Sequence, residues 1–180
     1  MGVAMLRPIR DVVLLSFLLA GSVRAQAVFV NELHYDNAST DANEAIEIAG
    51  PSGTSLTGWS IALYNGNGGT VYSTINLSGA IPNQCVNFGT VSVPAAGIQN
   101  GSPDGLALVN GLGQVVQFLS YEGTILAADG PAAGMTSTDI GIAEDGTGPA
   151  TSSLHLIGTG TTYADFTWTQ AAASFGSCNT

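Results

Sequence analysis

Five oxygen-bearing side chains lie within nine residues, just after the first strand-like apolar run of the chain. They are Asp36, Asn37, Asp41, Asn43 and Glu44. Carboxylate and amide oxygens are hard ligands, and Ca²⁺ takes about six to eight of them in proteins. The spacing is not that of an EF-hand, because the alternation of ligands and the central glycine are missing. Two interpretations stay open: a Ca²⁺ site, or a polar loop that joins two strands.

The other residues that could carry chemistry are few. His34 lies near the carboxylates of Glu32 and Asp36 in the sequence, and such a histidine could act as a general base. No nucleophile partner is recognisable, so a strand-end histidine bonded to backbone or water is the favoured interpretation. His155 alternates with leucines and is expected on a solvated strand face. The sequence contains no Gly-x-Ser-x-Gly, P-loop, dinucleotide or zinc motif, and we predict that this chain is not an enzyme.

The distribution of charge excludes several classes of ligand. The chain of 180 residues has 13 Asp and Glu but only three cations, which are Arg7, Arg10 and Arg24. Asp11 is the only acidic residue before Arg24, so the residues after Arg24 keep 12 carboxylates and no Lys or Arg. Such a surface repels phosphates, which argues against binding DNA, RNA or an anionic membrane. Phosphoryl transfer and Schiff-base chemistry also lack their usual cations.

The first residues have the anatomy of a secretion signal. A positive region with two arginines precedes the apolar run Val12–Ala20, and small residues follow at Val23–Ala27. The apolar run is too short to cross a bilayer as a mature helix, and cleavage after about residue 25 is expected. The sequence therefore predicts a signal peptide over residues 1–25 and one domain over residues 28–180. We expect a secreted, extracellular or periplasmic product with no membrane attachment after cleavage.

The elements that must position these side chains are short strands. Apolar or alternating runs are separated by Gly, Asn, Pro and Asp, and Asn-Gly pairs supply the positive φ of tight hairpins. In the run from Ala45 to Ala49, Ile46 and Ile48 are expected in a core and Glu47 on the outside. Residues 127–151 show no convincing strand and are expected to form a long surface excursion. The predicted strands are Val28–Leu33, Ala45–Ala49, Trp59–Tyr64, Val71–Leu77, Val86–Val93, Leu106–Val109, Val115–Tyr121, Leu154–Ile157 and Phe166–Thr169.

The predicted fold class is therefore all-β, an antiparallel sandwich or barrel. Cys85 and Cys178 are the only two cysteines of the chain. An even number of cysteines in an exported protein favours a disulfide, although two buried free thiols are the alternative. A bridge between them would join the last residues of the chain to its middle.

Three strings in order, VFVNELHYDN (28–37), EAIEIAGPSG (44–53) and LTGWSIALYNGNGG (56–69), resemble the bacterial secreted branch of the lamin tail domain. The family pattern of Asn-Glu, Glu-x-Ile-Glu-Ile and Leu-x-Gly-Trp is matched here by Asn31-Glu32, Glu44–Ile48 and Leu56–Trp59. The resemblance continues through residues 97–110, 115–123, 129–141 and 165–168 and covers nearly all of Val28–Thr180. It implies an immunoglobulin-like β-sandwich.

The resemblance also implies a function. Lamin tail domains of exported bacterial proteins often precede a catalytic unit, commonly a nuclease of the endonuclease/exonuclease/phosphatase kind. Our first interpretation is a secreted, non-catalytic module for attachment to a protein or an extracellular polymer. The alternative is an accessory domain of a nuclease whose catalytic part lies outside this chain. A third is a calcium-dependent adhesin or carbohydrate binder that uses Trp59, Tyr64 or Trp168, although Trp59 at strand spacing is expected in the core.

Overall fold

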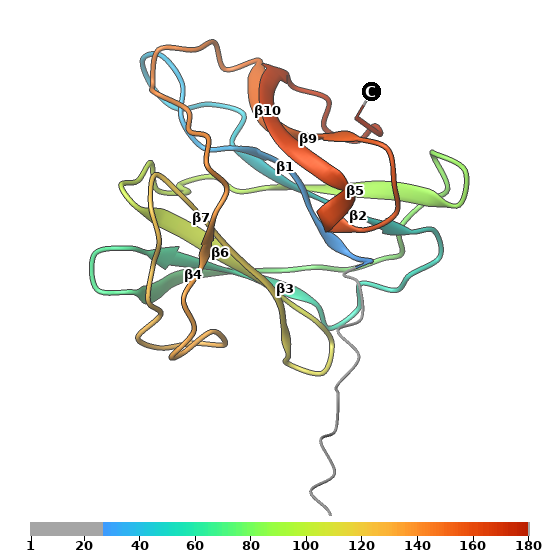
Figure 1. The fold of residues 1–180 in the computed structure, drawn as a ribbon, viewed down its shortest axis with the longest axis horizontal. Coiled ribbons are helices and arrows are strands. Elements are labelled where there is room, and N and C mark those ends of the chain that lie inside the picture. The colour runs from blue at the N-terminus through green and yellow to red at the C-terminus, as the bar shows by residue number, and fades with distance from the viewer. Residues whose placement is uncertain (1–26, 180) are drawn as a thin grey trace, which may run out of the picture.

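The computed structural model describes residues 27–179, so the predicted signal peptide lies outside the described residues. Figure 1 shows two sheets packed face to face. The first sheet has the order β10 (Phe166–Ala172), β9 (Ser152–Gly158), β1 (Phe29–His34), β2 (Ala45–Pro51) and β5 (Phe88–Pro94). The second has the order β4 (Thr70–Asn76), β3 (Ser60–Asn65), β6 (Asp104–Val109), β7 (Val115–Tyr121) and β8 (Thr138–Asp139).

Every strand pair is antiparallel except β7 with β8, which is parallel. The only helical element of the described chain is a 3₁₀ turn at Tyr163–Asp165. The prediction of an all-β sandwich is therefore confirmed. No helix in residues 27–179 has the length and apolar character needed to cross a membrane.

The core forms where alternating side chains of both sheets point inward. Ile46 and Ile48 of β2 are completely buried in it, as their spacing predicts, and they pack with Leu33 of β1 and Leu154 of β9. Leu106 and Leu108 of β6 add the same alternation from the second sheet. Because successive side chains of a strand point to opposite faces, Glu47 lies on the outer face of the first sheet.

Turn chemistry explains where strands begin and end. The predicted strand Val86–Val93 begins later, at Phe88, because Val86 and Asn87 both have positive φ values of 44° and 70°. Cys85 and Phe88 exchange backbone hydrogen bonds around these two residues, which makes them the centre of a two-residue hairpin turn. Positive φ at both central residues is the signature of a type I′ turn.

The segment between β7 and β9 is the longest connection in the sandwich. In Figure 1 it runs in orange from the lower sheet to the upper one along one end of the molecule. The segment contains the two-residue strand β8 and a bridge between Leu126 and Thr136, so the expectation of a strand-free excursion over residues 127–151 is wrong in this detail. The segment places Glu144 beside the end of β1.

Candidate functional site

The loop between β1 and β2 holds the five predicted oxygen ligands, but it does not turn them all toward one point. The Asn37 side chain closes the loop itself: Nδ2 donates to the carbonyls of Ala38 (2.9 Å) and Thr40 (3.1 Å), and Oδ1 accepts from the Ala42 N–H (2.9 Å). Asn43 donates to the Ala150 carbonyl at 2.9 Å. These amides are therefore used to shape the loop and to join it to the β7–β9 segment.

Two of the predicted ligands, Asp36 and Asp41, do lie close together. Asp41 accepts a hydrogen bond from the Asn100 amide at 3.0 Å and a long one from the Asn37 N–H at 3.4 Å. Burial raises the pKa of Asp36, and the nearby carboxylates of Asp41 and Glu144 raise it further. Glu44 instead accepts from the Gly97 N–H at 2.8 Å. Within residues 27–179 no three His, Cys, Asp or Glu side chains are placed to hold a metal ion, and the Ca²⁺ site stays a prediction.

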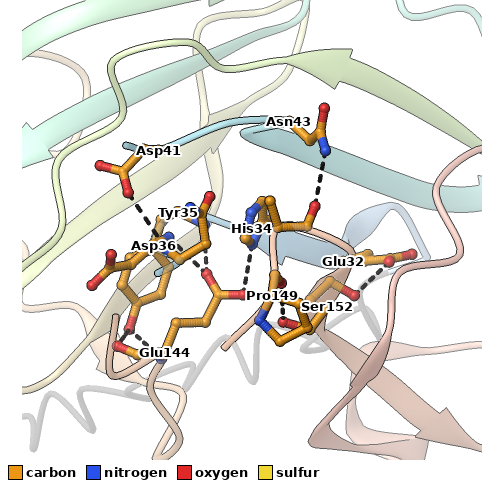
Figure 2. Close-up of polar contacts among 12 residues, drawn as sticks. Glu32, His34, Tyr35, Asp36, Asp41, Asn43, Glu144, Pro149 and Ser152 are labelled. Atoms are coloured by element: carbon orange, nitrogen blue, oxygen red, sulfur yellow. Dashed lines mark hydrogen bonds and ion pairs between the residues drawn. The ribbon is translucent and has the colours of Figure 1, made fainter. Parts of the chain in front are cut away.

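His34 is held by a carboxylate that lies 110 residues away in the sequence (Figure 2). Its Nδ1 lies 2.7 Å from Oε1 of Glu144, and both side chains are almost completely buried. The second oxygen of Glu144 accepts the backbone N–H groups of Tyr35 at 2.7 Å and Asp36 at 2.9 Å. We call His34, Tyr35 and Glu144 the His34 cluster. His34 does end a strand, as predicted, but its main partner is neither of the carboxylates beside it in the sequence.

The protonation of His34 follows from its two partners. Its Nε2 lies 3.1 Å from the Ala42 carbonyl oxygen, which can only accept, so this nitrogen carries a proton. The hydrogen bond to Glu144 raises the pKa of His34, against an opposing effect of burial. The imidazolium with both nitrogens donating is the form that satisfies both partners when Glu144 is ionised. Residues 27–179 contain no Lys or Arg, and the protonated His34 ring is the cation that lies beside Glu144.

Tyr35 extends this cluster into the sandwich. Its ring stacks on Tyr121 with centroids 3.9 Å apart. Its hydroxyl accepts the Glu144 N–H at 2.8 Å and donates to Glu122 at 3.1 Å. Burial is the main cause that raises the pKa of the Tyr35 hydroxyl, so it stays protonated and able to donate. Both nitrogens of His34 and both oxygens of Glu144 are thus engaged in holding loops together.

A second set of buried carboxylates lies on the outer face of the first sheet, beneath the end of the chain. Glu32 accepts from Ser153 Oγ at 2.6 Å, Ser174 N at 2.7 Å and Ser174 Oγ at 2.8 Å. Its cross-strand neighbour Glu47 accepts from Asn31 Nδ2 at 2.7 Å and Gly176 N at 2.5 Å. We call Glu32, Glu47 and the segment 174–179 that covers them the C-terminal cluster.

The C-terminal cluster corrects two expectations. Glu47 does point away from the core, but it is completely buried rather than solvated, because residues 174–179 cover it. Burial is the main cause that raises its pKa to about 7, with Glu32 as a further contribution. His155 is directly opposite Glu32 across β1 and β9 and is only 7% exposed, so the expectation of a solvated histidine is wrong.

The disulfide between Cys85 and Cys178 is present, with a Cα–Cα distance of 6.4 Å, which confirms the predicted pairing. It links the C-terminal segment to the turn before β5. Gln84 adds a hydrogen bond from its Nε2 to the Gly176 carbonyl at 2.8 Å. The end of the chain is thereby attached to the first sheet by carboxylates at one side and by the disulfide at the other.

A polar cleft of about 490 Å³ opens between the β3–β4 turn and the loop before β6. Its polar lining consists mainly of amide side chains and one buried carboxylate, from Asn65, Asn67, Gln99, Asn100 and Asp104. Asp104 is occupied by the N–H groups of Gly66 (2.9 Å) and Gly101 (2.8 Å) and so fixes both walls of the cleft. The side-chain amides of Asn67 and Gln99 make no hydrogen bond within residues 27–179.

Three of these features could not be assigned from the sequence. Glu144 belongs to a loose acidic group with Asp139 and Asp145, and nothing local assigns it to His34. Glu47 looks like any outward residue of an alternating strand. The cleft is formed by two loops about 35 residues apart in sequence, and the only available signal was the presence of Asn-Gly pairs in both. Comparison with protein-family models, curated proteins and solved structures found no match to this chain.

Proposed function

We propose that this chain is a secreted, non-catalytic attachment module that binds an uncharged extracellular polymer at the polar cleft. The resemblance of residues 28–180 to lamin tail domains supports a binding role, and the disulfide is compatible with an exported protein. The observation that carries the proposal is the cleft itself, with side-chain amides that have no partner within residues 27–179.

The chemistry of the cleft suits hydroxyl groups. A side-chain amide offers two donors and one acceptor oxygen, so it can bond to neighbouring hydroxyls as both donor and acceptor. The surrounding carboxylates and the absence of Lys and Arg after Arg24 oppose anionic polymers, including nucleic acids. A neutral polysaccharide satisfies both conditions. By contrast, the buried His34 and Glu144 are already bonded to each other and to backbone groups, which supports a structural role for them.

Affinity gel electrophoresis tests the proposal. The purified protein is run through gels that contain neutral polysaccharides (dextran, mannan, amylopectin), alginate or no polymer, and in parallel with plasmid DNA. We expect retardation by a neutral polysaccharide only. Asn67→Ala removes a cleft amide that makes no side-chain hydrogen bond in the fold and should abolish the retardation.

Asn76→Ala is the matched control, because Asn76 is an exposed asparagine at the end of β4 and does not line the cleft. Retardation by DNA or alginate, or equal retardation of the Asn67→Ala variant, would refute the proposed site. Cleavage of the plasmid by repurified protein would instead favour the nuclease alternative.

A further inference from the structure

A second cavity lies beside the C-terminal cluster and has a different character. It measures about 350 Å³ and is floored by Phe29 of β1, Ala49 of β2 and Leu156 of β9, which form a separate buried apolar cluster. The hairpin turn at residues 85–88 borders it, as do residues 158–161 of the β9–β10 loop and the disulfide with Asn179. Residues from several segments therefore line it, and its volume is in the range of small-molecule sites.

No residue that lines this cavity carries a charge. The 12 carboxylates that follow Arg24 in the sequence all lie outside this lining. The polar groups of Asn31 and Asn179 at the cavity are largely satisfied: Asn31 donates to Glu47 at 2.7 Å, and Asn179 donates to the Leu156 carbonyl at 2.9 Å. An ion would find no side chain of opposite charge here, whereas an apolar molecule would exclude water from the apolar floor.

Val86 is the least expected residue of the lining. It is 90% exposed, and it adopts φ = 44° at the first central position of the hairpin turn. β-Branched residues are disfavoured at positive φ, where Asn, Asp and Gly are the usual choices. In the absence of a ligand, both the exposure of the Val86 side chain and its backbone conformation are therefore energetically unfavourable. Strained positions of this kind are concentrated at ligand sites.

The turn that presents Val86 is also held more firmly than a surface hairpin requires. Cys85 at its start is bonded to Cys178, and Gln84 donates to the Gly176 carbonyl at 2.8 Å. Gln84 Oε1 also accepts the Thr90 N–H at 2.7 Å across the base of the turn. These bonds fix the position of Val86 at the edge of the cavity.

From the uncharged lining, the concave shape with a buried apolar floor and the strained exposed valine, we propose that this cavity binds a small, uncharged, apolar molecule, and that Val86 packs against it. This site is separate from the polar cleft and does not depend on the function proposed for the cleft. In the bound state, the apolar surface of Val86 and of the floor would be removed from water together.

A neutral fluorescent probe, N-phenyl-1-naphthylamine, tests this site with the full-length mature protein. We expect saturable fluorescence enhancement with one probe per chain. Val86→Asn should weaken probe binding at least about tenfold, while the Tm stays the same or rises, because Asn accepts positive φ more readily than Val. A loss of binding without a loss of stability cannot be ascribed to misfolding.

Asn87→Gly is the matched control, because it relaxes the second position of the same turn without changing its apolar surface. This variant should bind the probe as the parent does. The proposal fails if the parent shows no saturable binding, if Val86→Asn binds as tightly as the parent, or if Asn87→Gly loses binding to the same extent as Val86→Asn.

Discussion

Glu144 and Glu47 are both almost completely buried glutamates, but their partners differ. Glu144 lies 2.7 Å from the ring of His34, which is a cation when protonated. Glu47 is bonded only to neutral donors, the Asn31 amide and the Gly176 N–H. The hydrogen bond to Glu144 raises the pKa of His34, whereas burial raises that of Glu47 to about 7. The difference teaches that burial without a neighbouring cation favours the protonated form of Glu47.

The largest effect is expected from removal of the shared acceptor in the His34 cluster. Glu144→Ala leaves His34 Nδ1 and the N–H groups of Tyr35 and Asp36 without partners. We expect a loss of about 4 kcal/mol in the free energy of unfolding, measured by urea denaturation at pH 6. Because the raised pKa of His34 stabilises the fold below about 6.5 and this contribution is lost as pH rises through the folded pKa, the loss should be smaller at pH 9.

Glu144→Gln is the control for this prediction. The amide oxygen can still accept the two backbone N–H groups, but it carries no charge to hold the imidazolium. We expect a smaller destabilisation than for Glu144→Ala and a lower pKa for His34 in an NMR titration. An unchanged His34 titration would show that Glu144 does not set the charge of the ring.

The disulfide that holds the C-terminal cluster should contribute nearly as much to the free energy of unfolding as Glu144 does. Replacement of both cysteines by serine should cost about 3–4 kcal/mol, since the bridge closes a loop between residues separated by 93 positions. If the segment 174–179 then detaches, Glu32 and Glu47 become accessible to water, and hydrogen exchange at Ser174 and Gly176 should accelerate. Full protection of these two amides in the variant would mean that the carboxylates hold the segment without the disulfide.

Glu47 should give the protein an unusual dependence on pH. Its folded pKa of about 7 lies above the ordinary glutamate pKa of 4.5, so the folded state binds the extra proton between these values. Stability should therefore fall as pH rises from 4.5 to 7, by about 3 kcal/mol in total. Urea denaturation across this range is the measurement. In Glu47→Gln the decline should shrink to the contribution of the other groups, and an equally steep decline would assign it elsewhere.

The smallest effect is expected at the hairpin turn. Asn87→Gly should stabilise the fold by less than about 1 kcal/mol, because glycine adopts φ = 70° without steric cost. Thermal unfolding at a pH where the His34 cluster and the C-terminal cluster are both intact measures this shift. A clear drop in Tm would show that the Asn87 side chain makes a contribution that its backbone conformation does not explain.

Much of the fold could be predicted from alternation and turn residues. The run from Ala45 to Ala49 predicts β2 and its two core isoleucines, and the Asn-Gly turn after β3 predicts the hairpin with β4. The start of β5 could not be placed, because Val86 looks like a strand residue and its positive φ is imposed by the hairpin. The β1–β2 loop was predictable as a loop rich in oxygen ligands, of which the structure brings Asp36 and Asp41 together, whereas nothing local predicts that the two loops of the polar cleft meet.

By itself, the sequence determined the class of fold, the pairing of the only two cysteines and the shortage of cations, because these depend on local alternation and on counts of residues. Only the tertiary structure decided which carboxylates are buried. Glu47 lies between two core isoleucines and would face water in an isolated sheet, but residues 174–179 return over it. Glu144 meets His34 across 110 residues. Local alternation indicates on which face of a sheet a side chain lies. Which segment covers that face depends on the path of the whole chain.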